Sequence, residues 1–347
     1  MQRLYVGRMY ALAITCCSKL LRHKSIPSVT FFLRNPRKKV MEPTTPGQER
    51  GDFEFILFNE RGLRSGWRLL IFLAIIFAIF TGIGFLLRPF AARLPQGIVP
   101  AVLIPNEAFQ FLVVVFATWI MSRIERRNMG EYGLPLRNSS ALSRFVRGYI
   151  FWGFLPLSLL LLTLRTLHVF YFGKLSLHDG QIFTWAGIWV VFFILVGLAE
   201  EYSLRGYLLY TLAEGIGFWP AAIVLAALFA YLHSRNPGET RIGVIMTAFF
   251  ALFASAVLRY TGNLWLAVGA HAGWDWGESY FYGVNDSGMQ VPGHLLNPQT
   301  PGPAWLNGGT VGPEGSILAL LLLTAMTVLV AVIYRNTRKP VLVITRQ

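Results

Sequence analysis

Charged residues are scarce in this chain. Only 14% of its 347 residues are Asp, Glu, Lys or Arg, and 54% are hydrophobic. An ordinary soluble domain carries roughly 25% charged residues. A soluble fold could not hide so much apolar surface, so the composition excludes a typical water-soluble domain and predicts a membrane protein.

Cysteine is nearly absent, since the chain contains only the adjacent pair Cys16 and Cys17. Such a pair cannot build a disulfide framework or a cysteine-ligated metal site. The sequence also lacks G-x-x-x-x-G-K-[ST], G-x-G-x-x-G and H-E-x-x-H, and no internal repeat is evident. The common nucleotide-binding and zinc-protease motifs are therefore missing.

Acidic residues are outnumbered, with 17 Asp and Glu against 31 Lys and Arg and a net charge of +14. Such a charge can serve nucleic-acid binding, but the basic residues gather at the flanks of apolar runs and form no single stripe. Anionic lipid headgroups of the bilayer explain this pattern, so we expect no nucleic-acid partner.

Eight apolar runs approach the roughly 20 residues that a helix needs to cross a bilayer. They cover residues 69–87, 98–121, 148–164, 183–198, 219–232, 242–258, 264–276 and 317–334. The fifth and seventh runs are short and contain His, Gly or Asp, as expected of helices that line a polar interior. The sequence therefore predicts an all-α, polytopic helical membrane bundle of about eight spans around a membrane-embedded polar cavity.

Lys and Arg indicate the orientation, because they concentrate on cytoplasmic loops. Connection 123–147 contains six Arg, whereas connection 277–315 contains no Lys or Arg. The first should be cytoplasmic and the second external, which puts both termini in the cytoplasm. We therefore predict a basic N-terminal cytoplasmic segment at 1–66, a helical membrane domain at 67–336 and a basic cytoplasmic tail at 337–347.

The N-terminal residues 1–40 contain nine Lys or Arg and no Asp or Glu. A basic leader without acidic residues is typical of an organellar transit peptide. The stretch that begins at Met41 is polar and resembles an ordinary bacterial N-terminus, so translation from Met41 is the favoured hypothesis. Under it, we expect a protein of the bacterial plasma membrane.

Glu200, Glu201 and Arg205 directly follow residues 181–198, which contain no Lys, Arg, Asp or Glu. Charged groups at membrane depth are costly unless they face a protein-lined or wet cavity, so they indicate function. Glu201 and Arg205 are four residues apart on one helix face. Pairing between them would leave Glu200 free for the cavity.

Three helices are expected to deliver polar groups to this cavity. The helix that carries Glu200 has no Pro up to residue 214 and can continue to the following glycine turn. At a rise of about 1.5 Å per residue, Glu200 then lies level with His233 on the returning helix. His271 and Asp275 share one face of a later helix, so the cavity should lie near mid-membrane and open toward the cytoplasm.

Gly269 and Gly273 form a G-x-x-x-G pattern around His271. Small residues at this spacing let a neighbouring helix approach closely. We expect them to make room for a substrate or a partner.

The three motifs Glu200-Glu201-xxx-Arg205, Phe229-xxx-His233 and His271-xxx-Asp275 occur in successive helical segments. In this order they resemble the CPBP family, the type II CAAX prenyl endopeptidases related to the Ras-converting enzyme and to bacteriocin-immunity proteins. The resemblance covers a core at about residues 183–276. It implies an intramembrane endopeptidase, a hydrolase that removes the last three residues of prenylated CAAX proteins.

Roles transfer from the family by motif position. The resemblance implies that Glu200 is the general base, that His233 helps to hold the attacking water, and that His271 and Asp275 stabilise the oxyanion. The family often has Asn at the last place, and an ionised Asp cannot donate a hydrogen bond. We therefore expect Asp275 to orient His271 through one imidazole nitrogen. The candidate catalytic set is Glu200, Glu201, Arg205, His233, His271 and Asp275, and the partner is a peptide or membrane-protein substrate, prenylated in the CAAX case.

Two mechanisms and two further functions remain open. Glu200 can activate water without a cofactor, or Glu200, His233 and His271 can bind Zn²⁺ with one open position, as in a metalloprotease. A secondary transporter or proton channel would also place Glu, His and Asp at mid-membrane, but it should show a repeat. A non-catalytic immunity or scaffold protein would need no intact base.

Overall fold

The computed structural model describes residues 56–59, 62–93, 95, 97–135, 139–236 and 238–337. Most of the predicted segment 1–66, including Cys16, Cys17 and Met41, lies outside the described residues, as does the predicted tail beyond Thr337. The chain divides into two compact units, Met1–Pro89 and Phe90–Gln347.

The first unit contains one long apolar helix, α3 (Ser65–Leu87), preceded by a short antiparallel pair of strands, β1 (Phe58–Asn59) and β2 (Gly62–Leu63). The indole Nε1 of Trp67 donates a hydrogen bond of 3.0 Å to the carbonyl of Ile56, which fixes the strand pair against the start of the helix. The 3-10 helix η1 (Arg88–Arg93) crosses the boundary to the second unit.

The second unit is helical and carries every candidate catalytic residue. Its first described elements are α4 (Pro100–Glu125), η2 (Met129–Tyr132), α5 (Ala141–Arg147), η3 (Gly148–Phe154), α6 (Leu155–Thr166) and β3 (Tyr171–Leu175). There follow α7 (Gly180–Ser203), η4 (Leu204–Leu208), α8 (Leu209–Ile216), α9 (Phe218–His233), α10 (Arg241–Thr261) and α11 (Trp265–Trp276). The last are η5 (Gly277–Tyr282), β4 (Leu296–Gln299), α12 (Ala304–Asn307), η6 (Pro313–Gly315), α13 (Ile317–Tyr334) and η7 (Arg335–Thr337).

Helix lengths confirm a polytopic helical membrane protein, although they do not confirm a count of eight spans. Among the described residues, six helices are long and apolar enough to cross a bilayer. They are Ser65–Phe90, Pro100–Glu125, Ala141–Thr166, Gly180–Ile216, Arg241–Thr261 and Ile317–Tyr334. The fifth and seventh predicted spans are the shorter helices α9, of 16 residues, and α11, of 12 residues, and both fall below the roughly 20 residues that a span needs.

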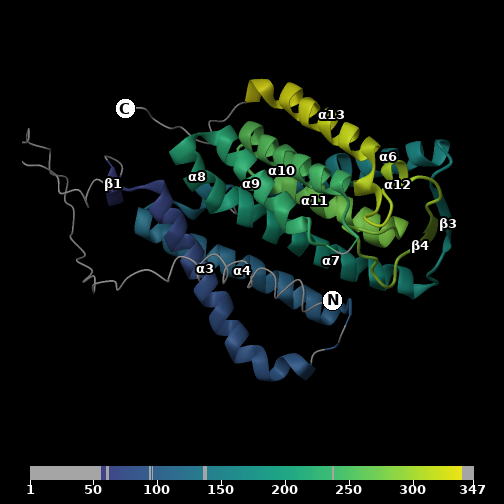
Figure 1. Cartoon of the computed structure of the whole chain (residues 1–347), viewed down its shortest axis with the longest axis horizontal. Coiled ribbons are helices and arrows are strands. Elements are labelled where there is room, and N and C mark those ends of the chain that lie inside the picture. The colour runs from purple at the N-terminus through teal and green to yellow at the C-terminus, as the bar shows by residue number, and fades with distance from the viewer. Residues whose placement is uncertain are drawn as a thin grey trace, which may run out of the picture. The chain divides into compact units, whose positions relative to one another are not determined.

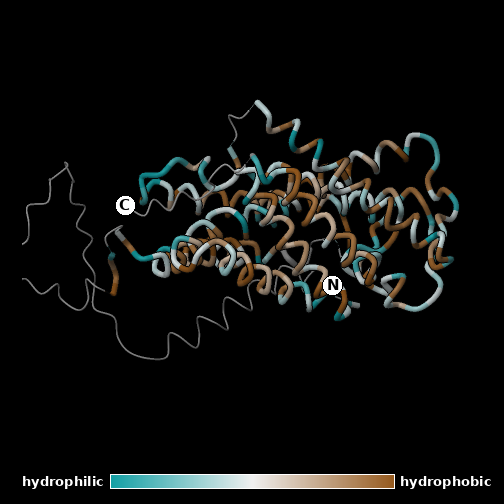
Figure 2. The backbone as a smooth tube through the Cα atoms, turned by 90° about the horizontal axis from the view of Figure 1, so that it is seen from above, coloured by the Kyte–Doolittle hydropathy of each residue, from teal (hydrophilic) through white to brown (hydrophobic). Residues whose placement is uncertain are grey.

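Glycine and hydroxyl residues set several helix ends in the second unit. Gly217, with φ of +89°, separates α8 from α9, and Gly262, with φ of +77°, ends α10. A left-handed backbone costs glycine little because it has no Cβ. The hydroxyl of Thr240 accepts a 3.1 Å hydrogen bond from Gly243 N and so caps the start of α10. In Figure 2 the hydrophobic residues follow the helices, and hydrophilic residues gather at many of the turns.

Helix α11 is the buried centre of the second unit. All ten residues from Leu266 to Asp275 are buried. The helix packs mainly against η3, α7 and α5, and it also contacts α10, beside which Figure 1 shows it. A helix enclosed on all sides needs no polar face. The polar groups that α11 does carry, His271 and Asp275, must therefore find partners within the protein.

The G-x-x-x-G pattern of α11 packs against another segment of the same chain. A Cβ at Gly269 would lie 2.1 Å from the carbonyl oxygen of Phe145, and one at Gly273 would lie 2.2 Å from that of Tyr149. On the opposing segment, a Cβ at Gly148 would lie 2.2 Å from the carbonyl oxygen of Leu266. The close helix approach is as predicted. The space is filled by α5 and η3, however, so it leaves no room there for a substrate.

Replacing Gly273 by Ala should destabilise the protein, because the new methyl group would press on backbone that cannot rotate away. We expect a loss of about 1–3 kcal/mol, typical of an overpacked core. Gly187→Ala is the matched control, since its Cβ would meet nothing within 4 Å on the same kind of helix. Thermal unfolding of both variants in detergent measures the difference. Equal midpoints would show that α11 and η3 are not packed this closely.

The chain beyond α11 is more structured than an external loop. The predicted connection 277–315 begins as η5, a π-helical continuation of α11 that extends to Tyr282. Further on, β4 pairs with β3 in antiparallel register, and Trp189 on α7 donates a 3.0 Å hydrogen bond to the carbonyl of Pro292. These bonds hold the segment against α7 and bring its acidic residues toward the helices.

Candidate active site

The first motif lies where α7 changes direction. Glu200 and Glu201 occupy the last turn of α7, and Arg205 lies in the π-helical segment η4. Within η4, Gly206 leaves the helical region with φ of −79° and ψ of −129°. The expected continuous helix to the glycine turn therefore exists, from Gly180 to Ile216, but it is kinked. Wide π-helical turns of this kind are frequent at functional sites.

Glu201 is the most enclosed member of the motif, with no exposed side-chain surface. Its Oε1 accepts a hydrogen bond of 3.3 Å from Arg205 Nη1, as the spacing of four residues predicts. The same oxygen lies 3.0 Å from His271 Nδ1. Because a carboxylate only accepts, Nδ1 carries the proton of this bond. Glu201 therefore links α7 to α11 as well as to Arg205.

His271 is surrounded by carboxylates. Its Nε2 lies 3.6 Å from Glu200 Oε2 and 3.4 Å from Asp275 Oδ2. The edge of its ring meets the ring of Phe250 at a centroid separation of 4.9 Å. Glu200 retains 25% side-chain exposure, whereas His271 retains 9%. The hydrogen bond at Nδ1 fixes the orientation of the buried His271 ring. Its Nε2 therefore lies near Glu200, which is the more exposed carboxylate.

His233 lies apart from this cluster. Its Nδ1 donates a 2.9 Å hydrogen bond to the carbonyl of Phe229, one turn earlier on α9. The ring of Phe229 contacts His233 at 4.2 Å and also lies beneath the guanidinium of Arg205 at 5.0 Å. In the part of the chain that the structure describes, no hydrogen bond or ion pair joins His233 to Glu200 or His271. Phe229 therefore separates His233 from the first motif.

Glu107 on α4 belongs to the surroundings of Glu200, although the sequence interpretation passed over it. It lies within electrostatic range of Glu200 and accepts hydrogen bonds from Asn106 Nδ2 and Gln110 Nε2, at 3.2 and 3.0 Å. The sequence did contain a signal for Glu107. It is a carboxyl group inside the apolar run 98–121, and such groups are costly in a membrane unless they have a function.

Three further acidic residues meet beside the site. One carboxylate oxygen each of Glu278, Asp286 and Glu314 lies within 4.8 Å of the others. Burial raises the pKa of Asp286 to about 6 and that of Glu314 to about 7. Glu278 and Asp286 had been expected in an exposed external loop. The tertiary fold instead buries Glu278 completely in η5.

His233 faces part of this acidic region. Burial raises the pKa of Glu239, and the hydrogen bond from Thr240 N and the charge of His233 partly oppose that rise. His233 likewise opposes the rise at Glu314. The residue predicted to hold water near Glu200 therefore lies within electrostatic range of a second set of carboxylates.

The arrangement does not fit the zinc site that the sequence left open. A metal site of this kind needs at least three His, Cys, Asp or Glu ligand atoms close together. Among the described residues, Glu278, Asp286 and Glu314 meet this condition, with ligand atoms within 4.8 Å of one another. Glu200, His233 and His271 do not form such a group. In addition, both nitrogens of His271 face carboxylates. Zn²⁺ therefore has no assigned role in the reaction proposed below.

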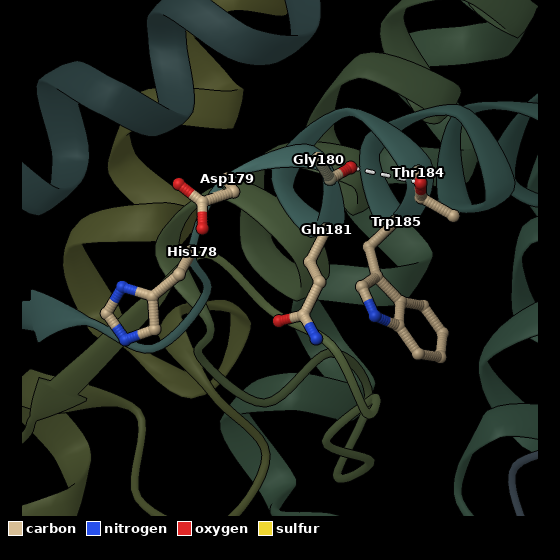
Figure 3. Close-up of a pocket in the computed structure, with 6 residues that line it drawn as sticks. All are labelled: His178, Asp179, Gly180, Gln181, Thr184 and Trp185. Carbon is tan, nitrogen blue, oxygen red and sulfur yellow. Dashed lines mark hydrogen bonds between the residues drawn. The ribbon is translucent and has the colours of Figure 1, made fainter.

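One surface hollow lies far from this chemistry. It encloses about 560 Å³ at the start of α7 and is lined by His178, Asp179, Gly180, Gln181, Thr184 and Trp185 (Figure 3). Gly180 precedes Glu200 by 20 residues, which is about 30 Å along a helix. A second hollow is lined by residues from Trp119 to Met129. Neither contains a candidate catalytic residue, so the predicted substrate cavity around Glu200 remains a prediction.

Fold and site together define a polytopic helical membrane protein with a buried Glu–His–Asp cluster where α7 meets α11. Residues 182–277 match the family model for type II CAAX prenyl endopeptidase Rce1-like proteins. This segment contains all three motifs, and the match supports the resemblance to the CPBP family that the motifs predict. No curated protein and no solved structure matches the chain.

Proposed function

We propose that this protein is an intramembrane endopeptidase in which Glu200 activates the attacking water. The observation that carries the proposal is the approach of His271 Nε2 to Glu200 Oε2 at 3.6 Å, within the segment that matches the protease family. Peptide hydrolysis needs a base for water and a donor for the developing oxyanion. Glu200 and His271 supply these two groups side by side.

The proposed reaction begins at Glu200. The carboxylate takes one proton from water while the water oxygen bonds to the carbonyl carbon of the scissile peptide. The carbonyl oxygen becomes an oxyanion and accepts a hydrogen bond from His271 Nε2. Since Nδ1–H already donates to Glu201, this role requires the doubly protonated imidazole. Glu200 then returns the proton to the amide nitrogen as the C–N bond breaks.

The family match supports a substrate of the CAAX type or a related membrane protein, with cleavage near its C-terminus. We further propose that connection 123–147 and both termini face the cytoplasm, from which such a substrate would enter. This orientation rests on the excess of Arg in 123–147 and its absence from 277–315. A reporter protein active only outside the cytoplasm, fused within 277–315, should be active if the orientation is correct.

The direct test is cleavage by the purified protein in lipid vesicles. Two peptides that end in a Cys-a-a-X sequence, one prenylated on Cys and one not, are incubated with the protein, and mass spectrometry detects the released tripeptide. We expect cleavage, and the ratio of the two rates reports whether the prenyl group is recognised. Proton flux across the vesicle membrane without cleavage of either peptide would instead favour the transporter hypothesis.

Asp275 is expected to act by positioning His271 rather than by its charge. Its Oδ2 lies 3.4 Å from His271 Nε2 in an ion-pair contact, and the amide oxygen of Asn could occupy the same place. Asp275→Asn should therefore keep activity within about tenfold of wild type, whereas Asp275→Leu should lose about 100-fold, the usual range for a group that orients another. Cleavage rates of folded protein decide this. If Asn is as inactive as Leu, the negative charge itself is required.

A further inference from the structure

Glu278, Asp286 and Glu314 come from three separate places in the segment after α11. Glu278 lies in η5, Asp286 follows η5, and Glu314 lies in η6 at the entrance to α13. The segment 277–315 contains no Lys or Arg that could neutralise them. His271 lies within electrostatic range of Asp286, and His233 lies within electrostatic range of Glu314. The cluster therefore combines burial with an excess of acidic groups.

Glu278 is the unusual member. Its side chain is completely buried, and neither of its carboxylate oxygens has a hydrogen-bond partner. The indole Nε1 of Trp274, one helical turn earlier, is also buried without a hydrogen bond of good geometry, and it lies close enough to Glu278 to favour the ionised carboxylate. A buried carboxylate without a partner is strongly unfavourable, so such groups in proteins are normally paired or coordinate a metal. One carboxylate oxygen of Glu278 lies within 4.8 Å of one oxygen each of Asp286 and Glu314.

The other two carboxylates are held in place by hydroxyl groups. Asp286 Oδ2 accepts a 3.0 Å hydrogen bond from Ser279 Oγ. Glu314 Oε2 accepts from Ser287 N at 3.2 Å and from Ser287 Oγ at 3.0 Å. Hydrogen bonds that orient a carboxylate from behind are the usual support of metal ligands. Hydrogen bonds thus hold two of the three carboxylates in place. The third, Glu278, is buried without a hydrogen bond of good geometry.

We propose that Glu278, Asp286 and Glu314 bind a hard divalent cation, Ca²⁺ or Mg²⁺. All three donors are carboxylate oxygens, which these two ions prefer to nitrogen or sulfur. Oxygens on opposite sides of a bound Ca²⁺ lie about 5 Å apart, twice the metal–oxygen distance. The mutual separation of at most 4.8 Å is compatible with one shared ion, with water completing the coordination.

The cation joins parts of the chain that are distant in sequence. It connects η5, the continuation of the helix that carries His271, to η6 at the start of α13. It also neutralises acidic charge next to Asp275, because Glu278 and Asp286 both act electrostatically on Asp275. Its expected effect is to stabilise the fold around the site, independently of any peptide cleavage.

The test uses the full chain in detergent, stripped with a chelator and dialysed against Ca²⁺, Mg²⁺ or Zn²⁺. We expect about one Ca²⁺ or Mg²⁺ bound per chain, and a rise of the thermal unfolding midpoint on the order of 5 °C at saturating cation. Whichever ion gives the larger rise identifies the preferred one. Asp286→Asn and Glu314→Gln should lose both binding and rise. Asp179→Asn, an exposed acidic residue outside the cluster, should keep both.

Terbium luminescence gives a second readout that does not depend on stability. Tb³⁺ replaces hard cations and emits when a nearby indole transfers energy to it, so the wild type should emit and Trp274→Phe should lose most of that emission while still binding one ion. Absence of bound Ca²⁺, Mg²⁺ and Tb³⁺ would overturn the proposal, as would tighter binding of Zn²⁺ than of either hard ion. A higher unfolding midpoint for Glu278→Gln, without any response to cations, would show that the cluster shares protons instead.

Discussion

Glu200→Gln should abolish peptide cleavage and leave the fold intact. The amide has the shape of the carboxylate but cannot take a proton from water, and general bases contribute about 100- to 10,000-fold to such reactions. Glu200 is 25% exposed and contacts His271 only at 3.6 Å, so its neutralisation should cost little stability. Cleavage rate and thermal unfolding are measured on the same preparation.

Glu107→Gln is the matched control for this variant. It makes the same chemical change on the neighbouring helix α4, within electrostatic range of Glu200. In the part of the chain that the structure describes, Glu107 forms no hydrogen bond or ion pair with His271. It should change the rate by less than about tenfold, because it removes a neighbouring charge and no proton transfer. If Glu107→Gln is inactive while Glu200→Gln still cleaves, Glu107 is the base and the assignment to Glu200 is wrong.

Glu201→Gln should damage the fold. Glu201 has no exposed surface and Arg205 has 2%, so the substitution leaves a buried guanidinium without its counter-ion. Removing one member of a buried ion pair costs about 3–5 kcal/mol. The variant should therefore unfold at a markedly lower temperature in detergent, or accumulate poorly. Normal stability would show that Arg205 finds another partner.

The double variant Glu201→Leu with Arg205→Leu separates the two roles of Glu201. Removing both charges avoids the uncompensated guanidinium, so most of the stability should return. Cleavage should remain impaired, because His271 Nδ1 loses the carboxylate that orients it at 3.0 Å. Recovery of full activity along with stability would mean that Glu201 serves only as the partner of Arg205.

Short-range spacing in the sequence predicted the features that depend on one helix. The apolar runs predicted a helical membrane protein, and the interval of four residues predicted the contact between Glu201 and Arg205. The G-x-x-x-G at Gly269 and Gly273 predicted a close helix approach. Each follows from the fixed rise and turn of an α-helix, which are known before any tertiary contact forms.

Exact helix ends were less predictable, because they depend on local backbone choices and on the packing around them. The kink at Gly206 lies inside a stretch that reads as one continuous apolar helix. The α-helical part of α11 ends at Trp276, but the helix continues as the π-helical η5 to Tyr282. The predicted total of eight spans is not confirmed, since six helices among the described residues are long and apolar enough to cross a bilayer.

Contacts between distant segments were decided by the tertiary structure alone. Which nitrogen of His271 meets Glu201, and which meets Glu200 and Asp275, depends on how α7 and α11 cross. Depth along the helices brought His233 level with Glu200 in the prediction, but depth does not determine the face on which a side chain lies, and His233 contacts Phe229 instead.

The acidic cluster illustrates the limit most clearly. Glu278, Asp286 and Glu314 are separated by 8 and 28 residues, and no periodicity relates them. They meet because η5 prolongs α11 and because β4 and η6 fold the following segment back onto the helices. Burial of Glu278 then removes the water that would otherwise solvate its charge. Sequence alone thus determined the membrane class, the family motifs and the local ion pair, whereas the fold decided which carboxylates share one site, since that depends on long-range packing.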